Sequence, residues 1–153
     1  MRAKAQPIKI LVVDDFEPFR GLICSILRKK TDLQIVIEQA SDGLEGVQKA
    51  RELRPDLILL DIGLPKLTGT DAARQMRNLT PHSKIVCVSQ ESDADLVREM
   101  LRLGASGYVH KSRTREDLVL AIETVLMGKR FVSSTIQGFQ IETNDCASNS
   151  LRS

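Results

Sequence analysis

Hydrophobic residues recur along the chain in two alternating patterns. Short runs of aliphatic and β-branched residues predict buried strands, and five such runs occur, at residues 8–13, 33–38, 57–60, 84–88 and 107–110. After each run, apolar residues recur at the spacing of an amphipathic helix. These predicted helices begin near Pro18, Gly43, Thr70, Asp93 and Thr114. The alternation predicts a parallel sheet that helices cover on both faces, with right-handed crossovers.

The last predicted helix begins at Thr114, and Asp117 three residues later is close to a capping box. It ends before Gly128, where the periodicity fades into residues rich in Ser, Thr, Asn and Gly. We therefore expect one domain over residues 7–128, followed by a linker or flexible tail over residues 129–153 with no output domain. A chain of 153 residues, 42% of them hydrophobic, is long enough for one such core.

Composition excludes several classes of protein. The formal net charge is only +2, which gives no support for nonspecific binding to nucleic acid or membrane. No signal peptide or membrane-spanning run is visible. The three cysteines lack the spacing of a zinc site, and Cys24 and Cys87 lie in apolar patterns that predict small buried hydrophobes. We expect a reduced, cytoplasmic compartment.

Acidic residues follow two of the predicted strands. Asp14 and Asp15 end the first strand, and Asp61 ends the third. In an open parallel sheet the ligand site lies beyond the carboxyl ends of the strands, where the strand order reverses. If the order is 2-1-3-4-5, these three carboxylates share one crevice and need a compensating charge. A hard divalent cation with oxygen ligands satisfies this need, and Mg²⁺ suits a site with few protein ligands.

Two further polar residues end the remaining strands. Ser89 follows the fourth strand and Lys111 the fifth, and both can bind the oxygens of a transferring phosphoryl group. Asp61 is the candidate nucleophile that forms an aspartyl-phosphate, because it stands alone on its strand. Each acidic residue by itself could equally cap a turn or a helix. The combination with Ser89 and Lys111 favours a phosphoacceptor site.

Four motifs in this order resemble the receiver domain of two-component response regulators: DD, LLDIGLPKLTG, VSQES and GYVHK. The resemblance runs from about residue 8 to residue 128 and implies a flavodoxin-like fold, a doubly wound (βα)5 sheet. It implies that Asp61 accepts a phosphoryl group from a sensor histidine kinase or a phosphotransfer protein. Apart from this self-phosphotransfer and slow autodephosphorylation, no enzymatic activity is implied.

The resemblance also implies roles for the other residues. It implies a set of Mg²⁺ ligands, in which Asp15, Asp61 and the backbone carbonyl of Gly63 bind directly and Asp14 acts largely through water. Ser89 and Lys111 would hold the phosphoryl group, and Tyr108 would change rotamer as Ser89 moves toward it.

The chain departs from the family pattern at two positions. Gly63 has no side chain where a longer one is common, and Gln90 follows Ser89 where a small residue is usual. These departures, with Glu91 nearby, leave the lifetime of the phosphoryl group open. Neither removes a required group.

The segment LVLAIETVLMGKRFVSS resembles the end of the receiver in LuxR/NarL-type transcription regulators, where a DNA-binding helix-turn-helix would follow. Too few residues remain here for that domain, so the chain is either a fragment or a single-domain receiver, and DNA would be bound only through the absent domain. Extra apolar residues on the last helix favour a homodimer surface: Val119, Leu120, Leu126 and Met127.

Three other classes of protein can be compared with these motifs. A hydrolase of the haloacid-dehalogenase type would carry DxD at the nucleophile, but Ile62 and Gly63 follow Asp61. A dinucleotide-binding domain would need a glycine-rich turn after the first strand. An interaction module that works without phosphorylation stays open.

Overall fold

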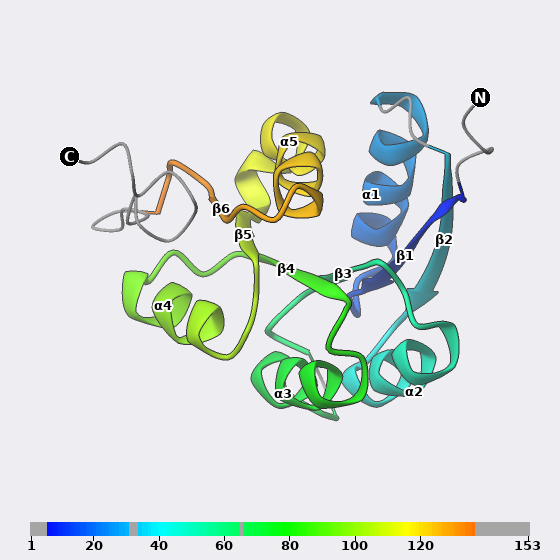
Figure 1. Ribbon diagram of the computed structural model, residues 1–153. Coiled ribbons are helices and arrows are strands. Elements are labelled where there is room, and N and C mark those ends of the chain that lie inside the picture. Colours follow the sequence, from blue (N-terminus) through cyan, green and yellow to red (C-terminus); the bar gives the residue numbers. More distant parts are fainter. Residues whose placement is uncertain (1–5, 31–33, 65, 137–153) are drawn as a thin grey trace.

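The computed structural model describes residues 6–30, 34–64 and 66–136 (Figure 1). The strands are β1 (Ile8–Val13), β2 (Ile35–Ala40), β3 (Leu57–Leu60), β4 (Lys84–Ser89), β5 (Gly107–His110) and β6 (Phe131–Val132). The helices are α1 (Glu17–Lys30), α2 (Gly43–Leu53), α3 (Gly69–Leu79), α4 (Ala94–Arg102) and α5 (Thr114–Leu126), and a 3₁₀ turn, η1 (Lys111–Arg113), precedes α5. Within these described ranges, no helix is long and apolar enough to span a bilayer.

The sheet is parallel throughout, in the order β2-β1-β3-β4-β5-β6. The predicted order 2-1-3-4-5 and the doubly wound α/β class are therefore confirmed, with one strand added at the edge. Strand β1 pairs with both β2 and β3, so that Val13 lies opposite Ala40 on one side and Leu60 on the other. The strand order reverses at β1 and β3, and the residues that follow these two strands are neighbours.

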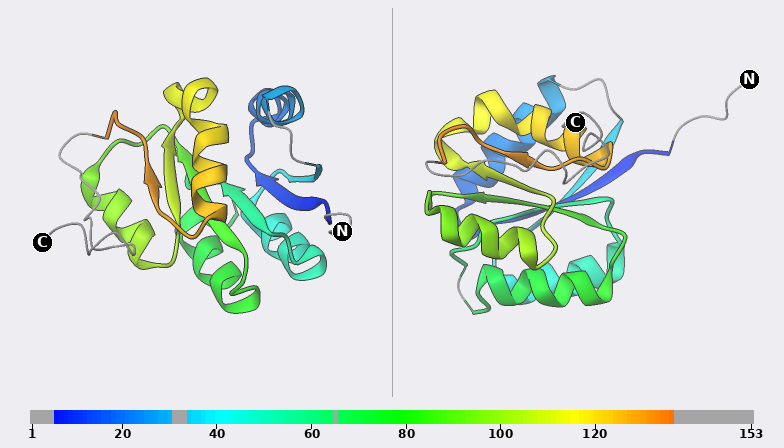
Figure 2. Two further views of the ribbon diagram at one scale, coloured as in Figure 1. Left: turned by 45° about the horizontal axis from the view of Figure 1, so that its top comes forward. Right: turned by 60° about the vertical axis from the view of Figure 1, so that its left-hand side comes forward.

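Helices cover both faces of the sheet (Figures 1 and 2). Helices α1 and α5 lie on one face, and α2, α3 and α4 lie on the other. Leu11 and Val13 pack into the core beneath α2 and α3, whereas Ile10 and Val12 pack beneath α1 and α5, because strand side chains alternate between faces. All four residues of β3 are buried, which explains why its sequence is apolar without interruption. Cys24 and Cys87 are free and buried, as predicted.

The predicted capping box at the start of α5 is wrong. Thr114 already has helical backbone angles, because η1 runs directly into the helix, and an N-cap residue needs an extended backbone. Its hydroxyl donates instead to the carbonyl oxygen of Lys111, at 2.7 Å. Asp117 does not reach back to cap the helix either, since its carboxylate accepts from Ser133 and Arg113.

The segment after α5 differs from the predicted tail. Residues 131–132 form β6, which pairs with β5, and the amide of Ser133 donates to the carbonyl oxygen of Tyr108 at 2.9 Å. Ile136 is 3% exposed and belongs to the same core cluster as Leu11 and Val13. A strand of two residues is too short to show a periodic pattern, so no feature of the sequence predicts it. Residues 137–153, with Cys146, lie outside the described residues.

Candidate functional site

Three carboxylates meet beyond the carboxyl ends of β1 and β3. The amide of Asp61 donates to the carbonyl oxygen of Val13 at 2.9 Å, which continues the β1–β3 pairing past the end of the strand. Asp14, Asp15 and Asp61 each offer one carboxylate oxygen, and these oxygens all lie within 4.8 Å of one another. The three acidic residues therefore lie together, as their positions at the ends of the strands predict.

Asp14 is the most deeply buried of the three, with 2% of its surface exposed. Its Oδ1 accepts from the amide of Phe16 at 2.8 Å. Its Oδ2 lies 2.9 Å from the ammonium of Lys111, an ion pair, yet within the described part of the chain it is a buried oxygen without a hydrogen bond of normal geometry. Asp15 is exposed beside it. Oδ2 of Asp14 can therefore accept further ligands, and it lies near the solvent-exposed carboxylate of Asp15. This arrangement suits a hard cation.

Asp61 carries the candidate nucleophilic oxygens. It is buried, its Oδ1 accepts from the amide of Gly63 at 3.1 Å, and its Oδ2 accepts from Lys111 at 3.4 Å. Burial raises the pKa of Asp61, and the charge of Asp14 raises it further, while the Gly63 amide and Lys111 act in the opposite direction. The fold therefore places the Asp61 carboxylate where burial and Asp14 disfavour its ionised form. Positive charge in the crevice would stabilise that form.

Lys111 supplies part of that positive charge. Its ammonium lies between Asp14 and Asp61 and over the ring of Phe19, 4.5 Å from the ring centre. Burial alone would lower the pKa of Lys111, but the close contact with Asp14 and the charges of both aspartates outweigh it, and the pKa is raised. The sequence predicted Lys111 at the site but not the aromatic ring beneath it, because Phe19 reads as an ordinary apolar position of α1.

The turn after β4 connects the site to Tyr108. Ser89 is 2% exposed, and its hydroxyl accepts from the amide of Glu91 at 3.0 Å. Tyr108 is fully buried, and its hydroxyl donates to the carbonyl oxygen of Glu91 at 3.0 Å. Burial raises the pKa of Tyr108 to about 12, so the phenol remains a donor at neutral pH. Ser89 and Tyr108 therefore both bind the main chain of Glu91, Ser89 at the amide and Tyr108 at the carbonyl oxygen.

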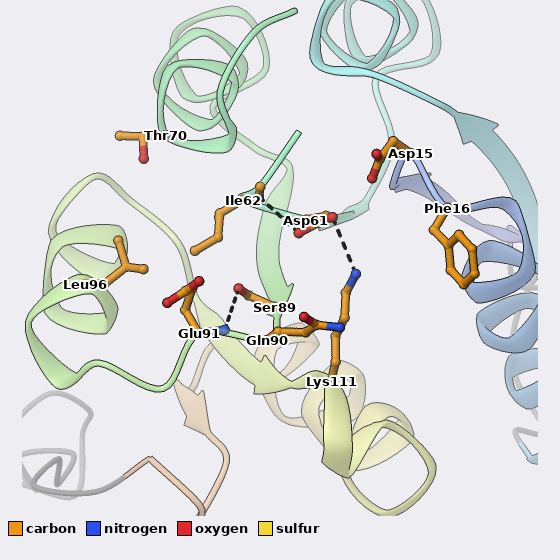
Figure 3. A pocket seen from close by; sticks show the side chains of 11 residues that line it. Asp15, Phe16, Asp61, Ile62, Thr70, Ser89, Gln90, Glu91, Leu96 and Lys111 are labelled. Carbon is orange, nitrogen blue, oxygen red and sulfur yellow. Dashed lines mark hydrogen bonds and ion pairs between the residues drawn. The ribbon is translucent and has the colours of Figure 1, made fainter. Parts of the chain in front are cut away.

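These groups surround an open cavity of about 530 Å³ (Figure 3). Asp61 directly after β3, Ser89 at the end of β4 and Lys111 directly after β5 all point into it. Further residues line it without having been predicted for the site: Phe16, Ile62, Thr70 and Leu96. They carry no strand-end signal, because loops and helix starts bring them there. The predicted residues Asp15, Gly63, Gln90 and Glu91 also line the cavity.

Comparison with known proteins decides the family. Residues 10–123 match the family described as the response regulator receiver domain. The chain belongs to this family. The chain is 36% identical over 144 residues to the response regulator GacA of Pseudomonas syringae pv. syringae, an alignment that covers 90% of this chain and 67% of that protein. It is 32% identical over 151 residues to the oxygen regulatory protein NreC of Staphylococcus epidermidis, with 94% and 69% covered.

A solved structure agrees with these sequence relatives. The receiver domain superposes with a TM-score of 0.79 on a LuxR-family two-component response regulator from Aurantimonas sp., at 30% identity, with 86% of this chain and 93% of that chain covered. The predicted membership in the LuxR/NarL-type group is therefore confirmed. The chain spans about two thirds of the length of GacA and NreC.

Proposed function

We propose that this receiver domain accepts a phosphoryl group on Asp61 from a sensor histidine kinase or a phosphotransfer protein. The observation that carries the proposal is the position of the Asp61 carboxylate. It lies at the wall of an open cavity, beside two other carboxylates and 3.4 Å from the ammonium of Lys111. Asp14 lies even closer to Lys111, at 2.9 Å, but it is 2% exposed and is not among the residues that line the cavity, whereas Asp61 is.

The reaction is a displacement at phosphorus. A carboxylate oxygen of Asp61 forms the new bond to phosphorus, and the bond from phosphorus to the imidazole nitrogen of a phosphohistidine breaks, with the electron pair leaving on that nitrogen. Lys111 faces the charge on the phosphoryl oxygens, and the hydroxyl of Ser89 donates to one of them. Lys111 must then exchange part of its ion pair with Asp14 and Asp61 for the new anion.

The residues present fit a magnesium ion. The donor set consists of carboxylate oxygens, one of them buried without a hydrogen bond of normal geometry, and Asp15 is open to the solvent. We assign Asp15, Asp61 and the carbonyl oxygen of Gly63 as direct ligands and Asp14 as a ligand largely through water. When bound, Mg²⁺ would offset the repulsion among the carboxylates and the incoming phosphoryl group.

The turn after β4, which both Ser89 and Tyr108 contact, would act as a switch. When the Ser89 side chain rotates to donate to the phosphoryl group, the hydrogen bond that it now accepts from the amide of Glu91 would be lost. Tyr108, which holds the same turn, would then adjust, and the surface around β4 and β5 would change. In a regulator with a DNA-binding domain, this change would control transcription.

The test is incubation with Mg²⁺ and acetyl phosphate, followed by intact-mass measurement. We expect one phosphoryl adduct per chain, which is lost when EDTA replaces Mg²⁺. If neither acetyl phosphate nor a phosphorylated kinase domain gives an adduct, the proposal is wrong, and an interaction module that works without phosphorylation becomes the better explanation.

We further propose that α5 forms a homodimer surface once Asp61 is phosphorylated. Leu120 and Met127 are 54% and 68% exposed, whereas Val119 and Leu126 are partly packed against the core. The predicted surface is thus reduced to two strongly exposed side chains. Exposed large apolar residues on one helix favour burial against a partner.

Leu120→Arg should weaken self-association of the phosphorylated protein by about tenfold or more, because a central apolar contact is replaced by a charge. Sedimentation velocity would measure it. Leu44→Arg is a matched control, since Leu44 is 55% exposed on α2, on the opposite face of the sheet (Figure 1). A phosphorylated wild type that stays monomeric at all concentrations would refute the surface.

A further inference from the structure

The backbone around Lys111 is held by groups that lie outside the phosphoacceptor site. The amide of His110 donates to the hydroxyl of Ser133 at 3.0 Å, just before Lys111. The carbonyl oxygen of Lys111 accepts from the hydroxyl of Thr114 at 2.7 Å. Side-chain hydroxyls therefore hold the peptide group before His110 and the one after Lys111, while the Lys111 side chain points into the cavity (Figure 3).

Ser133 is the centre of this arrangement. Its hydroxyl accepts from His110 and at the same time donates to Oδ2 of Asp117, at 2.8 Å. Ser133 is 2% exposed and Asp117 is 6% exposed, so solvent does not easily replace either bond. The other carboxylate oxygen of Asp117 accepts from Arg113 at 3.2 Å, which holds the carboxylate toward Ser133.

The main chain adds a second connection at the same place. The amide of Ser133 donates to the carbonyl oxygen of Tyr108 at 2.9 Å, and β6 pairs with β5 one residue earlier. Ser133 thus contacts the strand that carries both Tyr108 and the approach to Lys111. The segment after α5 is therefore attached to β5, the strand that leads to Lys111.

We infer that Ser133, oriented by Asp117, is a positioning residue that sets where the Lys111 ammonium lies during phosphoryl transfer; this rests on the proposed phosphorylation of Asp61. The lysine side chain is long and flexible, so the position of its ammonium between Asp14 and Asp61 depends on a fixed position of the Lys111 backbone. Small displacements of a charge that must meet a transferring group lower the rate strongly.

Ser133→Ala removes the hydroxyl and leaves the His110 amide and the Asp117 carboxylate without this partner. We expect the first-order rate of adduct formation at saturating acetyl phosphate and Mg²⁺ to fall about three- to tenfold. The acetyl phosphate concentration that gives half of the maximal rate should change much less, because the residues that line the cavity are unchanged. Ser134→Ala is the matched control: the same substitution one residue later, at an exposed position, should leave the rate unchanged. Ser133→Thr keeps the hydroxyl and should restore most of the rate.

A double mutant separates positioning from a purely structural role. In a Lys111→Ala background, Ser133→Ala should cause no further loss of rate, because the group it positions is gone, whereas its effect on thermal stability should persist. Independent, multiplying losses in the two backgrounds would overturn the inference. Equal rates for Ser133→Ala and Ser134→Ala would also overturn it, while an adduct on the wild type in the same assay would leave the phosphorylation of Asp61 standing.

If Ser133→Ala does not fold, Asp117→Asn provides the second variant, since it keeps the shape of the side chain and weakens the bond from Ser133. The same loss of rate, again absent in the Lys111→Ala background, is expected. A wild-type rate in folded Asp117→Asn would contradict the role of this pair.

Discussion

Asp61→Asn should abolish the phosphoryl adduct completely, with acetyl phosphate and with a phosphorylated kinase domain alike. The amide nitrogen and oxygen of asparagine are poor nucleophiles, and within the described part of the chain no second carboxylate lies in the same position against Lys111 and Ser89. Intact mass after incubation would show it. Asp95→Asn is the control, since the Asp95 side chain is 90% exposed on α4, and it should form the adduct normally.

The loss should not result from unfolding, because Asp61→Asn is expected to be more stable than the wild type without Mg²⁺. Burial and the neighbouring Asp14 raise the pKa of Asp61 in the folded protein. The wild type therefore loses stability as the pH rises from the ordinary aspartate value of about 3.9 through this raised pKa. Asparagine does not ionise, so the variant should gain on the order of 1 kcal/mol in the free energy of unfolding at neutral pH.

Urea denaturation at several pH values would measure this gain. The difference between variant and wild type should vanish below about pH 3.9, where the carboxyl is protonated in both the folded and unfolded wild type. A variant that lacks the adduct and is also clearly less stable at neutral pH would show that Asp61 has a structural role instead.

The positions of the acidic residues could be predicted from the sequence because they follow from topology. Once strands alternate with helices, the residues after β1 and β3 must meet at the same edge of the sheet, whatever the details of packing. This topology alone predicts that Asp14, Asp15 and Asp61 lie close together. Ser89 and Lys111 followed from the same reasoning at β4 and β5.

Contacts that depend on tertiary packing could not be predicted in this way. Phe19 beneath Lys111 is one helical apolar position among several, and nothing in its spacing marks it. Thr114 and Asp117 have the spacing of a capping box, but the 3₁₀ turn before α5 and the arrival of Ser133 give both side chains other partners. A pattern of residues cannot show which of two hydrogen-bond partners lies closer in the fold.

The attachment of the segment after α5 to the sheet could not be predicted from the sequence either. Its polar composition is typical of a linker, and most of the hydrogen bonds that attach β6 are backbone bonds that any residue can make. Ser133 looks like one polar residue among many in the sequence. Its hydrogen bonds with the amide of His110 and the buried carboxylate of Asp117, both distant in sequence, distinguish it.

Gly69→Ala should destabilise the domain by about 1–3 kcal/mol, as expected when a methyl group is forced into a filled space. Gly69 begins α3, and a Cβ there would collide with the Cα of Ile62 and lie 2.8 Å from the carbonyl oxygen of Asp61. Both obstacles are backbone atoms, which cannot move aside as the end of a flexible side chain would. The start of α3 must therefore move away from the loop that follows β3.

Gly21→Ala is the matched control for this prediction. Gly21 lies within α1, and a Cβ there would meet nothing within 4 Å. The same substitution should therefore stabilise the helix by about 0.5–1 kcal/mol. Urea denaturation of both variants would give opposite signs. Wild-type stability in Gly69→Ala would mean that α3 can shift without cost, and the close contact with residues 61 and 62 would then not be what fixes the loop behind the phosphoacceptor aspartate.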